Sequence, residues 1–268
     1  MLRFAPIAGE RKPLLDLLGL LSRIRVGKAS RDIQKAARQQ YLFPVVGAII
    51  GLATAVVGYL IFEYASDLIG NLLAAVLLCM FLYSLTGIIH IEGLADFADG
   101  LMASGDIERK RSAMKDVSLG AGGSFAMLMD IILEISLLSQ LNGNSSALFP
   151  WFYGDNIPMI LGIIIAEISG KLAMNTSIRM GPSSHAGMGR LFVDSSTTMK
   201  FLTAIGISLS LGIFIAGIYG FIVLIGSLSG ICVTLISRKH FGGVGGDSLG
   251  AANEVGRLAA LLAWVVIL

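Results

Sequence analysis

The chain has 268 residues, of which 55% are hydrophobic and 14% are charged, whereas about 25% of a soluble globular domain is charged. The mean hydropathy is +0.80. These values exclude an ordinary soluble fold, and they also exclude a disordered chain, which carries far fewer apolar residues. The net charge of +2 does not suggest binding to nucleic acid, and we expect no such partner. The composition predicts an integral membrane protein in a lipid bilayer.

Apolar runs of about 20 residues, the length that crosses a bilayer, define the expected helices. They lie at 42–62, 70–89, 122–141, 157–175, 201–218 and 221–236. A seventh run, 258–268, is too short to span unless its helix begins near Leu249. We therefore predict an all-α, polytopic bundle of about six to seven transmembrane helices. It forms a single membrane-embedded domain over 1–268, with 1–40 as a cytoplasmic or interfacial amino-terminal segment.

The basic residues fall on one side of this map. Nine precede the first span, four lie between the second and third, four surround the loop after the fourth (Lys171, Arg179, Arg190 and Lys200), and three follow the sixth (Arg238, Lys239 and Arg257). The alternate loops contain none. Because Lys and Arg favour cytoplasmic loops, the amino terminus and the long polar loops are predicted to be cytoplasmic, in a multi-pass protein of the cell (inner) membrane.

Residues 13–26 alternate leucine pairs with charged residues. This pattern is typical of an amphipathic helix lying on the inner membrane surface. A short core helix of a cytoplasmic lobe is the alternative.

The most informative motif runs from His90 to Gly100, where the second span ends. If this stretch is helical, Glu92, Asp96 and Asp99 are spaced i, i+4, i+7 and share one face. Like charges so placed repel one another unless a cation joins them. A magnesium ion, held by one or two carboxylates and by substrate phosphates, would remove the conflict. A solvated acidic face at a helix end is the alternative.

Two glycine-rich segments follow on the same predicted side of the membrane. Residues 115–124 place Lys115 and small residues before the third span, where backbone N–H groups attract phosphate. Residues 241–250 contain Asp247 as their single acid. We predict that Asp247 and the Glu92 to Asp99 face share one magnesium-pyrophosphate in a cytoplasm-facing cavity, or alternatively that Asp247 caps a helix beginning at Ser248.

Four ionisable residues lie inside apolar segments as i, i+4 pairs. Asp130 pairs in this way with Glu134, and Glu167 with Lys171. Intramembrane charges indicate function by default, although a Glu–Lys pair can be purely structural. Both possibilities remain open for each pair, including a phosphate clamp at Lys171.

Three motifs together resemble the cobalamin synthase family, adenosylcobinamide-GDP ribazoletransferase. They are His90-x-Glu-Gly-Leu-Ala-Asp-x-Ala-Asp-Gly100, Met114-Lys-Asp116 followed by Gly120, and Gly242-Gly-x-x-Gly-Asp247-x-Leu-Gly-Ala251. The resemblance implies a membrane-embedded, Mg²⁺-dependent transferase of phosphorus-containing groups. It would join adenosylcobinamide-GDP to alpha-ribazole, or its 5′-phosphate, and release GMP.

The resemblance also implies roles for individual residues. The expected catalytic residues are Glu92, Asp96, Asp99 and Lys115; the expected metal ligands are Glu92, Asp96, Asp99 and Asp247; and the expected substrate-binding residues are His90, Asp116, Gly120, Lys171, Arg190 and Asp247. A homo-oligomer is possible.

Two other functions compete with this interpretation. A membrane phosphotransferase of the CDP-alcohol type also clusters aspartates at a cytoplasmic helix end, but its usual Ala-Arg step is Ala103-Ser104 here. An ion or solute transporter would use Asp130, Glu134 and Glu167 as coupling groups. It would concentrate its acids at mid-membrane, whereas the densest acidic cluster here lies at a predicted cytoplasmic end.

Overall fold

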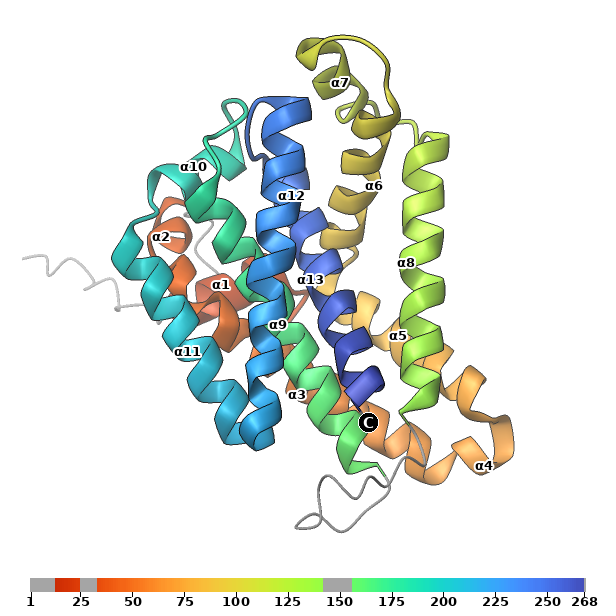
Figure 1. The fold of residues 1–268 in the computed structure, drawn as a ribbon. Helices are drawn as coiled ribbons and strands as arrows, with labels where there is room; N and C mark the ends of the chain where they lie inside the picture. Colours follow the sequence, from red (N-terminus) through yellow and green to blue (C-terminus); the bar gives the residue numbers. More distant parts are fainter. Residues whose placement is uncertain (1–12, 25–32, 142–155, 268) are drawn as a thin grey trace, which may run out of the picture.

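The structure is a computed structural model that describes residues 13–24, 33–141 and 156–267. Within these ranges the chain is a bundle of helices (Figure 1). The helices are α1 Pro13–Leu21, α2 Ile33–Arg38, η1 Gln40–Leu42, α3 Phe43–Tyr64, α4 Ser66–Ile69, α5 Asn71–Thr86, α6 Ile89–Met102, α7 Ile107–Ala113, α8 Ala121–Gln140, α9 Ile157–Met180, α10 Met188–Asp194, α11 Thr198–Ala216, η2 Gly217–Leu224, α12 Ile225–Phe241 and α13 Gly246–Ile267.

Five segments of the described chain are long and apolar enough to cross a membrane, or six when α5 and α6 count as one broken span. One of the five is the 44-residue segment Thr198–Phe241, which turns back on itself near Gly217. Figure 1 shows the two long helices of this segment, α11 and α12, running in opposite directions. They correspond to the two helices expected at 201–218 and 221–236. The prediction of an all-α, multi-pass membrane protein is confirmed.

Helix α9 is the centre of the bundle. Nearly its whole length is buried, and α3, α12 and α13 pack around it. Small residues permit the close approach: a Cβ on Gly51 of α3 would lie 2.8 Å from the Ile164 Cα, and one on Gly230 of α12 would lie 2.5 Å from the Ala173 carbonyl oxygen. Helices in lipid pack through such small-residue contacts, so α9 tolerates polar residues that an outer helix could not expose to lipid.

The expected helix over 70–89 is observed as α5, Asn71–Thr86, but it does not continue to 89. Its C-cap residue Gly87 adopts a left-handed conformation (φ 76°), and Ile88 follows with φ 56°. The two axes then meet at 91°. Because α-helical hydrogen bonding cannot continue through two left-handed residues, α6 starts in a new direction and carries the acidic motif back alongside α8 and α13 (Figure 1).

The last helix is longer than hydropathy indicates. The expected helix over 258–268, or from Leu249, begins at Gly246. Arg257 therefore lies in the middle of α13 and is 2% exposed, and Lys171 is fully buried in α9. Counting both with the cytoplasmic loops was wrong. Lys171 forms the expected i, i+4 pair with Glu167 of its own helix, at 3.7 Å, and Arg257 pairs with carboxylates of α8 and α9.

Helix α1 packs into the protein instead of presenting a free apolar face. Leu17, Leu18 and Leu21 are buried in one cluster with Phe43 and Val46 of α3. This arrangement supports the core-helix alternative for α1. The rest of the segment 1–40, at 1–12 and 25–32, lies outside the described residues.

Candidate active site

The acidic motif is helical, which meets the condition for its three acids to share a face, and Glu92 and Asp96 lie at the boundary between two cavities. One, of about 490 Å³, lies on the side of α10 and α13 and is called cavity 1. The other, of about 870 Å³, lies on the side of α5 and α8 and is called cavity 2. Glu92 and Asp96 line both.

Asp99 has a different environment from the other two acids of the motif. Its Oδ2 accepts a hydrogen bond from the Gly120 N–H at 2.8 Å, and its Oδ1 accepts one from the Gly123 N–H at 2.7 Å. A Cβ on Gly120 would lie 2.3 Å from Oδ1, so only glycine fits there. Asp99 thus caps the first turn of α8, whose own N-cap residue provides no side-chain acceptor. Gly120, predicted to bind substrate, contacts this carboxylate.

Asp247 joins Glu92 and Asp96 because α6 and α13 cross closely. A Cβ on Gly93 would lie 3.2 Å from the Asp247 Cα, and one on Gly250 would lie 2.8 Å from the His90 carbonyl oxygen. Asp247 lines cavity 1. Since α13 begins at Gly246, Asp247 lies within its first turn. No described hydrogen bond joins its carboxylate to the backbone, so the structure does not support the helix-cap alternative.

The glycine-rich loop before α13 is held mainly by contacts with the backbone of the chain near Pro182 and Ser184, and most of it does not line a cavity. The Val244 N–H donates to the Pro182 carbonyl oxygen at 2.7 Å, and the Ser184 N–H donates to the Val244 carbonyl oxygen at 3.0 Å. Gly243 has φ 157°, and a Cβ there would lie 2.4 Å from the Pro182 oxygen. Gly246 is the exception, because it lines cavity 1 and a Cβ on it would meet nothing within 4 Å.

Two basic side chains lie near the acids: Lys115, in the segment after α7, and Arg111, in α7. Lys115 and Asp116 line cavity 2, and Lys115 also lies with Arg111, His185 and Asp247 around a small space of about 10 Å³. The Nδ1 of His185 is 2.7 Å from the Ser184 hydroxyl. Burial, followed by the positive charges of Lys115 and Arg111, lowers the pKa of His185. The imidazole therefore stays neutral at pH 7 and can accept a proton.

A second charged group is buried behind cavity 2, in the centre of the bundle. The Arg257 guanidinium lies 2.5 Å from Glu134, 3.4 Å from Glu167 and 3.8 Å from Asp130, and it also pairs with Glu254. These residues come from α8, α9 and α13. Desolvated charges are stable only when paired and hydrogen-bonded, so the group joins the three helices.

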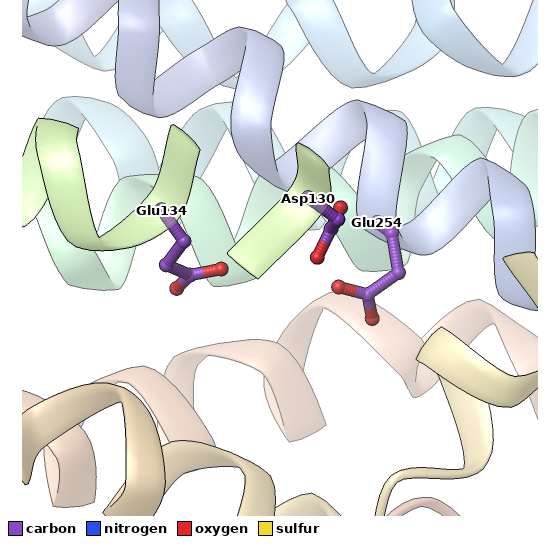
Figure 2. A group of neighbouring side chains, drawn as sticks. All are labelled: Asp130, Glu134 and Glu254. Atoms are coloured by element: carbon purple, nitrogen blue, oxygen red, sulfur yellow. The ribbon is translucent and has the colours of Figure 1, made fainter. Parts of the chain in front are cut away.

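Tyr83 connects this buried group to cavity 2. Its ring lines the cavity, and its hydroxyl donates to Asp130 at 2.7 Å and accepts from Arg257 at 2.8 Å. Figure 2 shows Asp130 and Glu134 on α8 beside Glu254 on α13. Within the described chain, these three are the group whose oxygens lie within 4.8 Å of one another, close enough to share a metal ion. The Arg257 guanidinium already pairs with all three of these carboxylates.

The predicted site residues thus divide into three sets, one of which is the Asp99–Gly120 contact at the start of α8. Around the two cavities the structure brings together Glu92, Asp96, Asp247, His90, Lys115 and Asp116. It does not bring Lys171 there, since the Nζ donates to Asn253 at 2.6 Å inside the bundle. Nor does it bring Arg190, which pairs with Asp194 at 3.2 Å on the surface.

Sequence reasoning missed Arg23, Tyr83 and the role of Arg257. Arg23 lines cavity 2 beside the α5–α6 break. It lies in the segment Leu21-Ser-Arg-Ile-Arg-Val-Gly27, which also resembles the family, but its spacing alone indicated no role for this side chain. A single Tyr in an apolar run gives no signal. The position of Arg257, i+3 from Glu254, was a readable signal of an intrahelical pair.

The fold and the site together define a multi-pass helical membrane protein with two cavities that share a pair of acids and have a lysine beside them. The family model described as "Cobalamin-5-phosphate synthase" matches residues 13–265. The chain belongs to this family, which confirms the resemblance noted from its motifs.

Curated relatives are similar over nearly the whole chain. Proteins named adenosylcobinamide-GDP ribazoletransferase are 35% identical in Methanosarcina barkeri (93% of this chain and 90% of that protein) and 35% identical in Methanocella arvoryzae (91% of each). One in Methanococcoides burtonii is 31% identical (97% of this chain and 94% of that protein). No solved structure matches.

Proposed function

We propose that this chain is an adenosylcobinamide-GDP ribazoletransferase that joins adenosylcobinamide-GDP to alpha-ribazole, or its 5′-phosphate, with release of GMP. The observation that carries the proposal is the meeting of Glu92, Asp96 and Asp247 with Lys115 at the boundary of two cavities. Family membership and the names of the relatives support the same activity. The CDP-alcohol and transporter alternatives gain no comparable support.

The reaction displaces one oxygen of a pyrophosphate by another. A ribose hydroxyl of the acceptor forms a bond to the phosphorus that carries the cobinamide, the bridging P–O bond breaks, and GMP leaves with the electron pair. The Lys115 ammonium stabilises charge on the phosphate oxygens. The hydroxyl proton passes to a base near the acids, and the neutral imidazole of His185, which lines cavity 1, is suited to this role.

The carboxylate oxygens of Glu92, Asp96 and Asp247 are suitable ligands for a magnesium ion. Among the described residues, no hydrogen bond or ion pair engages the carboxylates of Glu92, Asp96 and Asp247, whereas both oxygens of Asp99 are taken. Hard cations bind such oxygens, and magnesium commonly uses one or two carboxylates together with substrate phosphates. When bound, the ion would neutralise the pyrophosphate. We propose Glu92, Asp96 and Asp247 as its ligands, with Asp99 positioning α8.

We also propose that the cavities face the cytoplasm. Figure 1 shows α7, α10 and the adjoining ends of α9 and α12 at one end of the bundle, and α4 at the other. The first group carries Arg109, Lys110, Arg179, Arg190 and Arg238, whereas α4 contains no basic residue. Cytoplasmic ends collect Lys and Arg.

Turnover of the purified protein in detergent tests the proposal. With adenosylcobinamide-GDP, alpha-ribazole and Mg²⁺ supplied, we expect GMP and a cobalamin product in equal amounts. Asp96→Asn should lower the rate about 100-fold or more, as loss of a charge-stabilising group does, with unchanged protein yield. Asp194→Asn, on the exposed pair with Arg190, is the matched control and should keep full activity. Wild-type rates for Asp96→Asn would refute the assigned site.

A further inference from the structure

The two cavities share Glu92 and Asp96 but differ in charge. Arg23 and Lys115 line cavity 2. No lysine or arginine of the described residues lines cavity 1, whose ionisable side chains besides the shared acids are His90, His185 and Asp247. A nucleoside diphosphate carries negative charge that cationic side chains stabilise. This asymmetry places the pyrophosphate of the donor on the cavity 2 side of the two acids.

Size and wall chemistry agree with the charge. Cavity 2 is the larger, at about 870 Å³, and exposed apolar side chains such as Met80 and Ile88 line it. It therefore opens beside the outer surface of the bundle. A corrinoid joined to a nucleoside diphosphate is too large for an enclosed nucleoside pocket, and an open apolar cavity accommodates it with part of the molecule outside.

Cavity 1 suits a smaller and flatter molecule. Its volume of about 490 Å³ is within the range of ordinary ligand pockets. Two of its lining side chains, Phe43 and Phe192, hold their rings 5.6 Å apart with a tilt of 51°, and Met174 lies in the same wall. Aromatic rings and thioethers pack favourably on a planar heteroaromatic base.

We propose that helix α6 separates two substrate sites, with the corrinoid nucleotide donor in cavity 2 and the base-bearing nucleoside acceptor in cavity 1. This inference rests on the proposed function. The acceptor hydroxyl reaches the phosphorus from cavity 1, past Glu92 and Asp96, and the bond to GMP breaks on the opposite, cavity 2 side. Attacking and leaving oxygens are then in line, as phosphoryl transfer requires.

Three exposed methionines provide a matched test. Met188 lines cavity 1 alone, Met80 lines cavity 2 alone, and Met199 lines neither; they are 50%, 61% and 73% exposed. Each is replaced by tryptophan, so the chemical change is the same. Exposure means that the larger ring can be accommodated without disturbing the core, and the yield and thermal unfolding of each variant verify this.

The readouts are the KM of each substrate and the equilibrium binding of each substrate alone. Met188→Trp should weaken alpha-ribazole about tenfold and leave the donor within about twofold, a difference near 1.4 kcal/mol. Met80→Trp should do the reverse, and Met199→Trp should change neither. Gly246→Leu is a second variant that should behave as Met188→Trp, because Gly246 lines cavity 1 and a Cβ there would meet no atom within 4 Å.

The outcomes separate this inference from the proposed function. Equal weakening of both substrates by Met188→Trp and Met80→Trp, or effects in the opposite pairing, would overturn the two-site assignment even if the enzyme is active. A wild-type protein that neither binds nor converts the two substrates would overturn the proposed function, and the two-site assignment with it. Binding of each ligand alone keeps the assignment testable if turnover is slow.

Discussion

The four acids predicted for the metal site have different environments at the level of single residues. Glu92, Asp96 and Asp247 have carboxylates that no described polar partner engages, whereas both oxygens of Asp99 accept backbone N–H groups of α8. Sequence spacing alone does not distinguish the roles of Asp96 and Asp99, because both residues lie on one face of the helix. Only the approach of α8, which Gly120 and Gly123 permit, separates a ligand from a capping residue.

Asp247→Asn tests the ligand role at the residue scale. An amide is a poor magnesium ligand but a good helix cap, so we expect a large loss of turnover and a higher Mg²⁺ requirement, with unchanged thermal unfolding. Initial rates measured across a magnesium titration are the readout. Near-normal turnover at limiting magnesium would contradict the ligand role of Asp247.

At the scale of elements, the break between α5 and α6 determines the position of the acids. Gly87 and Ile88 both have positive φ, and the 91° bend that they produce returns α6 into the bundle. A Cβ on Gly87 would also lie 2.7 Å from the Arg23 Cγ. The break therefore positions one cation of cavity 2 as well as the two acids that line both cavities.

Two neighbouring substitutions should have opposite effects on this break. Gly87→Ala places a Cβ in the left-handed region, at a cost of about 1–2 kcal/mol, and displaces Arg23, so it should lower the thermal unfolding temperature and weaken donor binding. Ile88→Gly removes a strained, 57% exposed residue and should leave stability unchanged or raised. Unfolding in detergent, followed by circular dichroism, compares them; a lower midpoint for Ile88→Gly than for Gly87→Ala would refute the strain argument.

The sequence predicted most of the helices because hydropathy is a local property. The expected helix over 42–62 is observed at Phe43–Tyr64, and that over 122–141 at Ala121–Gln140. Hydropathy failed at α13, where Arg257 and Glu254 lower the average although buried partners pair with them. It also failed at Gly87, since a run of apolar residues contains no information about φ. The motifs predicted a cavity that Asp247 shares with Glu92 and Asp96, but they did not predict cavity 2, because its walls depend on how the helices cross.

At the scale of the whole molecule, the Arg257 group connects four helices of the described chain, α5, α8, α9 and α13. Asp130, Glu134, Glu167 and Glu254 all pair with this one guanidinium, and Tyr83 of α5 bonds to it. Because Tyr83 also lines cavity 2, the group fixes the wall of that cavity. The intramembrane acids that suggested a transporter are thus paired in the structure.

Arg257→Met should destabilise the folded protein far more than the small change in side-chain volume suggests. The remaining carboxylates would be buried without their cation, and breaking a buried ion pair costs about 3–5 kcal/mol. We expect a large loss of folded protein, measured by size-exclusion profile and protease resistance in detergent. Arg238→Met, on the exposed end of α12, is the matched control and should be near neutral. Equal stability of the two variants would argue against the network.

Cysteine labelling tests the orientation of the whole molecule. In a background with Cys79 and Cys232 replaced by alanine, Ser118→Cys before α8 should react only with reagent admitted to the cytoplasm, and Asp67→Cys on α4 should react from outside. Both positions are exposed. The reverse pattern would invert the topology and move the cavities to the outer side.

The position of Arg257 also constrains how the protein is made. During synthesis, Asp130, Glu134 and Glu167 enter the membrane before α13 does, because they come earlier in the chain. An unpaired arginine at mid-bilayer is costly, so α13 inserts favourably only where α8 and α9 already present their carboxylates. Insertion of α13 is therefore coupled to assembly of the preceding helices. A variant defective in α8 or α9 should leave α13 outside the membrane and expose its glycine-rich start to quality-control proteases.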